Sequence, residues 1–150
     1  MAVLMAVFLA APAAAVHPPD VPAALTVSVE PETVAPGQTV RVRLDLAPVD
    51  GVKINRYPQI KLIVDAHEGL VAAAEARVGD ARPPSTDTME RGGNYFATVE
   101  PVELELTVDS AASSGSHEVE GKLTYFYCVT KNGFFCAPKR TTVSIPLRVR

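Results

Sequence analysis

The two cysteines of the chain, Cys128 and Cys136, lie on either side of Lys131-Asn132-Gly133. Apolar residues lead into and out of these three residues. Asn-Gly favours a tight hairpin turn, because both residues tolerate a positive φ. The segment therefore predicts a β-hairpin with one cysteine on each strand. The number of residues in the turn then decides whether the two sulfurs can meet.

Two turn lengths give opposite outcomes. With the two-residue turn Asn132-Gly133, Cys128 faces Ala137, and Cys136 points to the other face of the sheet. With a three-residue turn that begins at Lys131, a type I turn ending in a left-handed glycine with a bulge, Cys128 falls directly opposite Cys136. Directly opposed residues have Cα atoms about 4.5–5.5 Å apart, within the reach of a disulfide. We favour the longer turn, which predicts a cross-strand Cys128–Cys136 disulfide.

Alternation of apolar and polar residues predicts further strands. The clearest example runs from Thr39 to Leu46, where valine and leucine alternate with charged residues, as in an antiparallel strand with one buried face. Seven to nine short strands separated by turn signals predict an all-β fold, an antiparallel immunoglobulin-like β-sandwich. The expected strands are 25–30, 39–46, 52–55 and 60–64 (one interrupted strand or two short ones), 94–99, 102–108, 119–128 and 139–149.

Two segments are harder to assign. Residues 69–78 contain alanine and glutamate that suit a helix, whereas their β-rich neighbours favour a strand. Residues 79–93 have no apolar period, and they predict a long loop of the kind that is often functional or mobile.

The first 15 residues are almost wholly apolar and end in Ala13-Ala14-Ala15. This pattern predicts a signal peptide over 1–15 that is cleaved after Ala15, although the usual positive residues are missing. An uncleaved anchor is the alternative, but about 15 apolar residues fall short of the roughly 20 that a span needs. We expect an extended lead-in over 16–24 and one immunoglobulin-like domain over 25–150. The domain would be periplasmic or otherwise exported, where disulfides persist.

Composition narrows the classes of function. The net charge of −3 is mild and the charges are scattered, which argues against a nucleic-acid partner. No stretch after the leader is long and apolar enough to cross a membrane, so we expect a soluble domain after cleavage. His67, His117 and the two cysteines have no recognised metal spacing, and we expect neither a metal nor another cofactor.

The cysteine hairpin resembles the N-terminal periplasmic domain of the DsbD family of transmembrane thiol:disulfide interchange proteins. The shared pattern is a strand (121–125), a cysteine, a short Gly-containing turn, a second cysteine followed by a proline (133–139), and a Thr-Val-x-x-Pro strand. Residues 50–55 are similar to the family's Asp/Gly-rich turn into its third strand. The likeness spans roughly 38–147, and its specific part is the hairpin. The seven residues between the cysteines exceed the family's common spacing.

The resemblance implies an immunoglobulin-like sandwich that relays electrons from a membrane domain to periplasmic partner proteins. Cys128 and Cys136 match the family's two redox cysteines, and the later one is the usual site of partner attachment. The partner would be a thioredoxin-like or membrane redox protein. The family's cap loop, an acidic pair followed by an aromatic residue, corresponds to the segment from Arg82 to Asn94. Met89 and Glu90 are the candidate cap residues there, and Tyr95-Phe96 is the other candidate.

Aromatic residues around the cysteines divide by strand parity. Phe126 shares a face with Cys128, so Phe126 and Phe134 are candidates for an apolar rim, whereas Tyr125 and Tyr127 are expected in the core. Charged residues nearby have two interpretations. Lys131, Lys139 and Arg140 would stabilise a thiolate or be solvated turn charges, and Asp87 or Glu90 would assist proton transfer or be ordinary loop carboxylates. We favour the second interpretation for both groups.

A non-catalytic alternative remains open. The chain would then be a β-sandwich used for binding or assembly, with Cys128–Cys136 as a structural disulfide. Closing this short loop would contribute roughly 2.5 kcal/mol, although the hairpin's own hydrogen bonds already close it.

Overall fold

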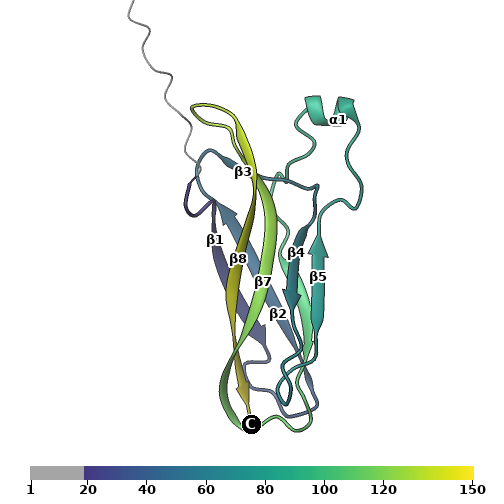
Figure 1. Ribbon diagram of the computed structural model, residues 1–150, viewed down its shortest axis with the longest axis vertical. Coiled ribbons are helices and arrows are strands. Elements are labelled where there is room, and N and C mark those ends of the chain that lie inside the picture. The colour runs from purple at the N-terminus through teal and green to yellow at the C-terminus, as the bar shows by residue number, and fades with distance from the viewer. Residues whose placement is uncertain (1–18) are drawn as a thin grey trace, which may run out of the picture.

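The computed structural model describes residues 19–150, so the predicted leader (1–15) and the first three residues of the lead-in lie outside the described residues. Two antiparallel sheets pack face to face (Figure 1). The first sheet has the order β1-β2-β6, and its strands are β1 (Ala23–Glu30), β2 (Thr39–Pro48) and β6 (Val102–Thr107). Strand β1 begins two residues before the predicted start, because Ala23 and Ala24 pair with the end of β2.

The second sheet is built around a long central strand. It contains β3 (Val52–Ile54), β4 (Ile60–Val64), β5 (Ala74–Val78), β7 (Gly115–Val129) and β8 (Phe135–Val149). Strand β8 pairs with one edge of β7, and both β3 and β4 pair with the other edge. The prediction over 52–64, one interrupted strand or two short ones, is therefore confirmed as two short strands along one edge of β7. The break contains Pro58, which cannot donate a ladder hydrogen bond.

With β3 and β4 taken as one strand, the order of strands is immunoglobulin-like. The first, second and fifth strands form one sheet, and the remaining strands form the other, with the sixth strand at its centre. The predicted fold class, an antiparallel immunoglobulin-like β-sandwich, is confirmed.

The core lies between the inner faces of the two sheets. Val40, Val42 and Leu44 of β2 are at most 1% exposed, while the intervening Arg41 and Arg43 point outward and are exposed. Alternate residues of β7 behave in the same way, and this row includes both tyrosines that parity placed in the core, Tyr125 and Tyr127. Burial raises the pKa of Tyr125 to about 12. The period-2 pattern of the sequence therefore identified the buried faces correctly.

Three local predictions need correction or completion. Residues 94–99 do not form a strand: Tyr95 makes a single bridge to Asn55, because its partner β3 is short and its chain turns away before Pro58. The loop over 79–93 contains a short helix, α1 (Thr86–Glu90), whose first turn is capped when Ser85 Oγ accepts a hydrogen bond from the backbone of Thr88. Residues 69–78 end in the strand β5, so the strand alternative is confirmed for 74–78.

Among residues 19–150, no helix is both long enough and apolar enough to span a membrane.

The backbone at Gly79, directly after β5, packs closely against Arg56 in the segment that follows β3. Gly79 has a φ of +110°, and a Cβ there would lie 2.2 Å from the carbonyl oxygen of Arg56. That oxygen accepts a hydrogen bond from the backbone N–H of Asp80 at 2.7 Å, and the Arg56 guanidinium binds the Asp80 carboxylate at 3.0 and 3.1 Å. Gly69 also has a positive φ, +71°, but open space surrounds the position of its Cβ.

This contrast gives a matched pair of substitutions. Gly69→Ala should lower the free energy of unfolding by about 1–2 kcal/mol, the cost of a left-handed alanine. Gly79→Ala should cost a further 1–3 kcal/mol, approximately, because its methyl group meets rigid backbone. Urea unfolding followed by circular dichroism measures both. Equal losses would contradict the close approach between Gly79 and Arg56.

Candidate functional site

The disulfide links the two strands of the long β7–β8 hairpin, close to its turn. Cys128 and Cys136 are directly opposed in the β7–β8 ladder, their sulfurs are bonded, and their Cα atoms are 4.0 Å apart. The register that places the sulfurs together is therefore confirmed. The turn differs in detail from the prediction, because Asn132 (φ 58°) as well as Gly133 (φ 132°) has a positive φ. Asparagine tolerates this conformation better than most residues.

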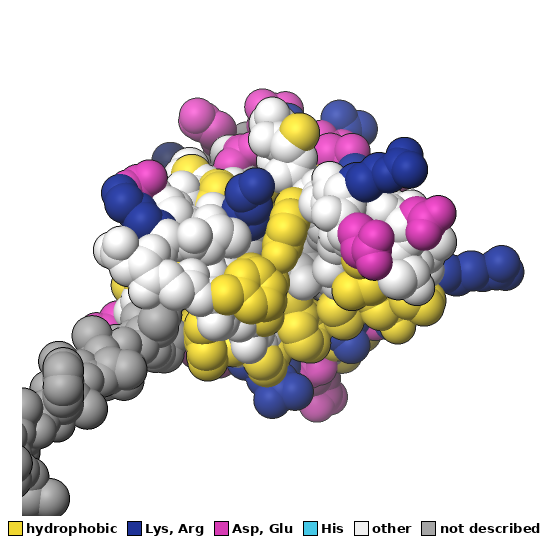
Figure 2. Space-filling view, turned by 90° about the horizontal axis from the view of Figure 1, so that it is seen from above, with side chains coloured by type: hydrophobic (Ala, Val, Ile, Leu, Met, Phe, Trp, Pro, Cys, Tyr) yellow, Lys and Arg dark blue, Asp and Glu magenta, His cyan; other side chains and the backbone are white. Residues whose placement is uncertain are grey.

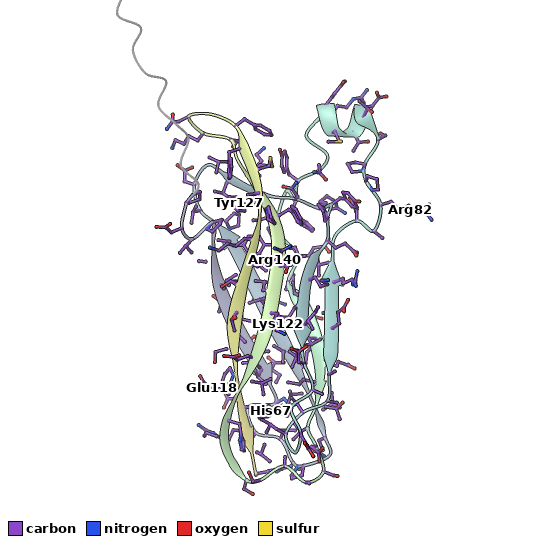
Figure 3. The ribbon with its side chains drawn as sticks, in the orientation of Figure 1. His67, Arg82, Glu118, Lys122, Tyr127 and Arg140 are labelled. Atoms are coloured by element: carbon purple, nitrogen blue, oxygen red, sulfur yellow. A yellow bond between two sulfur atoms is a disulfide. The ribbon has the colours of Figure 1, made fainter. Side chains whose placement is uncertain are left out.

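The disulfide lies on the outer face of the second sheet, the face turned away from the core. Tyr127 points into the core, so its neighbour Cys128 points outward. The residue directly opposite Cys128 on its other side is Lys53 of β3. One row across the sheet therefore reads Lys53, Cys128, Cys136. In Figure 3, Tyr127 marks this end of β7.

A second row runs beside the first and contains Asn55. The backbone N–H of Asn55 donates to the carbonyl oxygen of Phe126 at 2.9 Å, and Phe126 is opposite Pro138 of β8. On its other side, Asn55 is bridged to Tyr95. This second row therefore reads Tyr95, Asn55, Phe126, Pro138. Because residues opposite one another point to the same face, the two rows together form the surroundings of the disulfide.

The two sulfurs have different environments. Cys128 is only 1% exposed, although it faces outward, whereas Cys136 is exposed to solvent. The Sγ atom of Cys128 lies 3.4 Å from Oδ1 of Asn55, a residue that is itself 8% exposed. Next to this contact, the ammonium group of Lys53 lies over the ring of Tyr95, 5.4 Å from its centre. The pair is therefore accessible from one sulfur and enclosed at the other.

The predicted rim and cap residues fall in three places. Phe126 lies half-buried in the second row, and Phe134 is 72% exposed at the turn. Met89, which is 55% exposed, and Glu90 lie in α1, which rises at the same end of the molecule as the hairpin but on the other side of it (Figure 1). Tyr95, the other candidate for a cap, is the one that the backbone brings next to the site.

Two of the three cationic residues considered from the sequence bind other groups, and the third lies away from the disulfide. Lys131 binds the carboxylate of Asp50 at 2.5 Å, which raises the pKa of Lys131 and lowers that of Asp50. Lys139 donates to the carbonyl oxygen of Asp20 at 2.8 Å. Arg140 is opposite Thr124, further down the sheet than the disulfide (Figure 3).

Lys53 and Asn55 were missed by sequence analysis. Lys53 lies on β3 and Asn55 directly follows it, and the signal that could have found them was the predicted strand over 52–55, in which they share a face. Sequence periodicity cannot show that this face lies beside Cys128, because strand pairing between distant segments is set by the whole fold.

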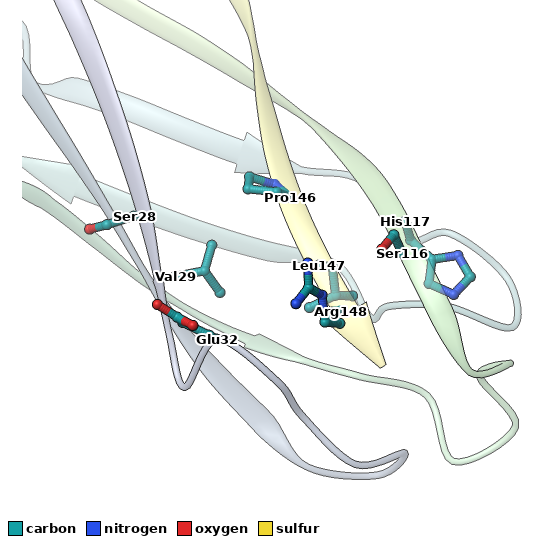
Figure 4. A pocket seen from close by; sticks show the side chains of 8 residues that line it. All are labelled: Ser28, Val29, Glu32, Ser116, His117, Pro146, Leu147 and Arg148. Carbon is teal, nitrogen blue, oxygen red and sulfur yellow. The ribbon is translucent and has the colours of Figure 1, made fainter. Parts of the chain in front are cut away.

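One groove on the surface lies far from the disulfide. This groove of about 370 Å³ is lined by residues of β1, β7 and β8 near His117 and Arg148, at the opposite end of the sandwich (Figure 4). Within residues 19–150, no three His, Cys, Asp or Glu side chains come together as a metal site would require.

Comparison with known proteins adds little to this description. No protein-family model matches the chain, and no curated protein matches it. Among solved structures, murine CRIg is similar over 85% of this chain and 98% of its own, with 15% sequence identity and a TM-score of 0.36.

The unequal burial of the two cysteines should give unequal losses in the free energy of unfolding when each is replaced by alanine. Cys136→Ala and Cys128→Ala both remove the disulfide, so each should lose up to about 2.5 kcal/mol of loop-closure stabilisation. Cys128→Ala should lose about 1 kcal/mol more, because it removes a buried sulfur, whereas Cys136→Ala leaves a Cys128 thiol that can donate to Oδ1 of Asn55. Urea unfolding of the two variants provides the comparison. A larger loss for Cys136→Ala would contradict the burial of Cys128.

Proposed function

We propose that this protein carries out thiol–disulfide exchange and relays electrons between partner proteins through Cys128 and Cys136. The observation that carries the proposal is the asymmetry of the pair. Cys136 is open to an incoming thiolate, and Cys128 is enclosed beside a polar group that can interact with it after the bond opens. Exchange needs access at one sulfur and a good leaving group at the other.

The reaction follows from these positions. A partner thiolate attacks Sγ of Cys136, a new sulfur–sulfur bond forms, and the electron pair of the broken bond remains on Sγ of Cys128. A second thiolate of the partner then attacks the mixed disulfide and releases Cys136 as a thiolate. The partner dithiol is oxidised to a disulfide, and this pair gains two electrons and, in the end, two protons. In the reverse direction, the Cys128 thiolate resolves the mixed disulfide.

A purely structural role explains the position of the bond less well. Strands β7 and β8 are each 15 residues long and pair along their whole length, and the disulfide is one pair from the end of this ladder. The loop it closes is already closed by the turn and the ladder. A cross-link would stabilise the sandwich more if it joined the two sheets, since loop-closure entropy grows with loop length.

The surface around Cys136 suits a protein partner. Exposed apolar side chains at this end include Phe134, Val49 and Val21, and apolar atoms gather over the hairpin end of the molecule in Figure 2. Aromatic residues are favoured in protein interfaces. The partner is proposed to be a thioredoxin-like or membrane redox protein, as the resemblance to the DsbD N-terminal domain implies, and the setting is the periplasm or another exported compartment.

Trapping of a mixed disulfide tests the proposal directly. Cys128→Ala leaves the exposed Cys136 thiol, which should form a stable mixed disulfide with glutathione disulfide, and with a single-cysteine thioredoxin whose thiol carries a thionitrobenzoate leaving group, detected by mass spectrometry. The matched variant Cys136→Ala leaves only the enclosed thiol and should react at least about tenfold more slowly. The wild-type pair should have a reduction potential above about −300 mV. A lower potential, together with no mixed disulfide in Cys128→Ala, would show that the bond is structural.

The effect of the Lys53 charge on the rate of disulfide reduction gives a second test. Because Lys53 is opposite Cys128, its ammonium group should stabilise the departing thiolate, and Lys53→Gln should slow reduction of the disulfide by dithiothreitol about two- to threefold at low salt. Lys61→Gln is the matched control, since Lys61 is opposite Thr124 on the same edge of β7. The difference between the variants should shrink at high salt. Equal rates at low salt would exclude an electrostatic role for Lys53.

A further inference from the structure

Asn55 is a buried polar residue fixed between two neighbouring segments. Its backbone donates to Phe126 on one side, and it is bridged to Tyr95 on the other. Its side chain is directed to the outer face, where only 8% of the residue is exposed. Burial of an amide group is costly unless it is hydrogen-bonded. Its presence here therefore requires a compensating interaction.

The contact at hydrogen-bond distance is with Cys128. Oδ1 of Asn55 and Sγ of Cys128 are 3.4 Å apart. In the disulfide neither sulfur carries a hydrogen, so this contact gains little while the bond is closed. The same contact becomes a true hydrogen bond after the bond opens. A Cys128 thiol can donate a hydrogen bond to Oδ1. A Cys128 thiolate can accept one from Nδ2 once the side-chain amide has flipped about the Cβ–Cγ bond. The flip is possible because the two ends of the amide have nearly the same shape.

We propose that Asn55 stabilises the sulfur of Cys128 in the opened pair and so selects Cys128 as the leaving and resolving sulfur. This inference rests on the proposed exchange function and adds a residue to it. When a thiolate bonds to Cys136, the electron pair of the broken bond moves to Cys128 Sγ, and an Asn55 N–H donates to the negative charge. Hydrogen bonds to charged groups are about twice as strong as neutral ones.

Other groups near Cys128 do not duplicate this role. Lys53 from β3 supplies charge from the same row as Cys128, and its ammonium group lies over the ring of Tyr95. The turn contributes Lys131, but its ammonium group is bound to Asp50. From β8, the residues opposite this part of β7 are Cys136 and Pro138, which carry no charge. Burial by itself disfavours the thiolate, so Asn55 is the direct hydrogen-bonding group that can oppose it.

Reactivity of the isolated Cys128 thiol is the test. In a Cys136→Ala background, the rate of alkylation by iodoacetamide is measured against pH, and its midpoint gives the pKa of Cys128. Asn55→Leu, which keeps the size and removes the amide, should raise this midpoint by about one pH unit. In the two-cysteine protein, the same substitution should slow opening of the disulfide by dithiothreitol about tenfold. Asn55→Ser, which retains a hydroxyl donor, should recover part of both effects.

A nearby asparagine provides the control. Asn94 also has a buried side-chain oxygen, and this oxygen has no hydrogen-bond partner among the described residues. Asn94→Leu should change neither the midpoint nor the opening rate by more than about twofold, which separates the hydrogen bond from general packing. Circular dichroism checks that each variant is folded. If Asn55→Leu does not fold, Asn55→Ala replaces it with the same expected direction.

The outcomes separate this inference from the function on which it rests. An unchanged midpoint and opening rate in the folded Asn55 variant overturn the role of Asn55, even if the wild-type protein exchanges with thioredoxin. Absence of a mixed disulfide in Cys128→Ala, with a wild-type reduction potential in the range of structural disulfides, overturns the exchange function itself. A raised midpoint and slower opening, absent in Asn94→Leu, support Asn55 as the partner of Cys128.

Discussion

Strand β7 determines the site because it is paired on both edges at the end where it carries a cysteine. On one edge β8 supplies Cys136, and on the other β3 supplies Lys53, each directly opposite Cys128. Asn55 follows on from β3 and reaches Cys128 from the next row. Residues from two distant parts of the chain, β3 with Asn55 and the β7–β8 hairpin, are thereby held side by side by backbone hydrogen bonds. The chemistry proposed for this pair depends on those two edges being occupied together.

The same arrangement explains the unequal exposure of the sulfurs. Cys128 lies on the central strand, where side chains from both neighbouring strands cover it, and it is 1% exposed. Cys136 lies on the outermost strand of its sheet and has a neighbour on one side only, so it remains exposed. A disulfide between a central and an edge strand is therefore asymmetric by position. This asymmetry alone favours attack at Cys136, before any effect on the acidity of either thiol is considered.

Local features of the sequence were sufficient for the hairpin but not for its surroundings. The Asn-Gly turn and strand parity predicted the register of Cys128 and Cys136, and alternation placed Tyr125 and Tyr127 in the core. The roles of Lys53 and Asn55 depend on which distant strand lies beside β7, and alternation within a strand contains no information about that choice. Residues 94–99 were misassigned for the related reason that their partner β3 is too short to support a strand.

The tip of the hairpin is fastened independently of the disulfide. The backbone N–H of Thr130 donates to the carbonyl oxygen of Gly51 at 2.8 Å, and Lys131 binds Asp50. A Cβ at Gly51 would lie 2.8 Å from Cβ of Lys131, so the two turns are in close contact. These contacts and the long β7–β8 ladder remain when the sulfur–sulfur bond opens. None of these contacts involves a sulfur atom, so the proposed opening of the bond needs movement of two side chains rather than of the sheet. Under the proposed function, such a support would keep the surroundings of the cysteines in place through repeated exchange.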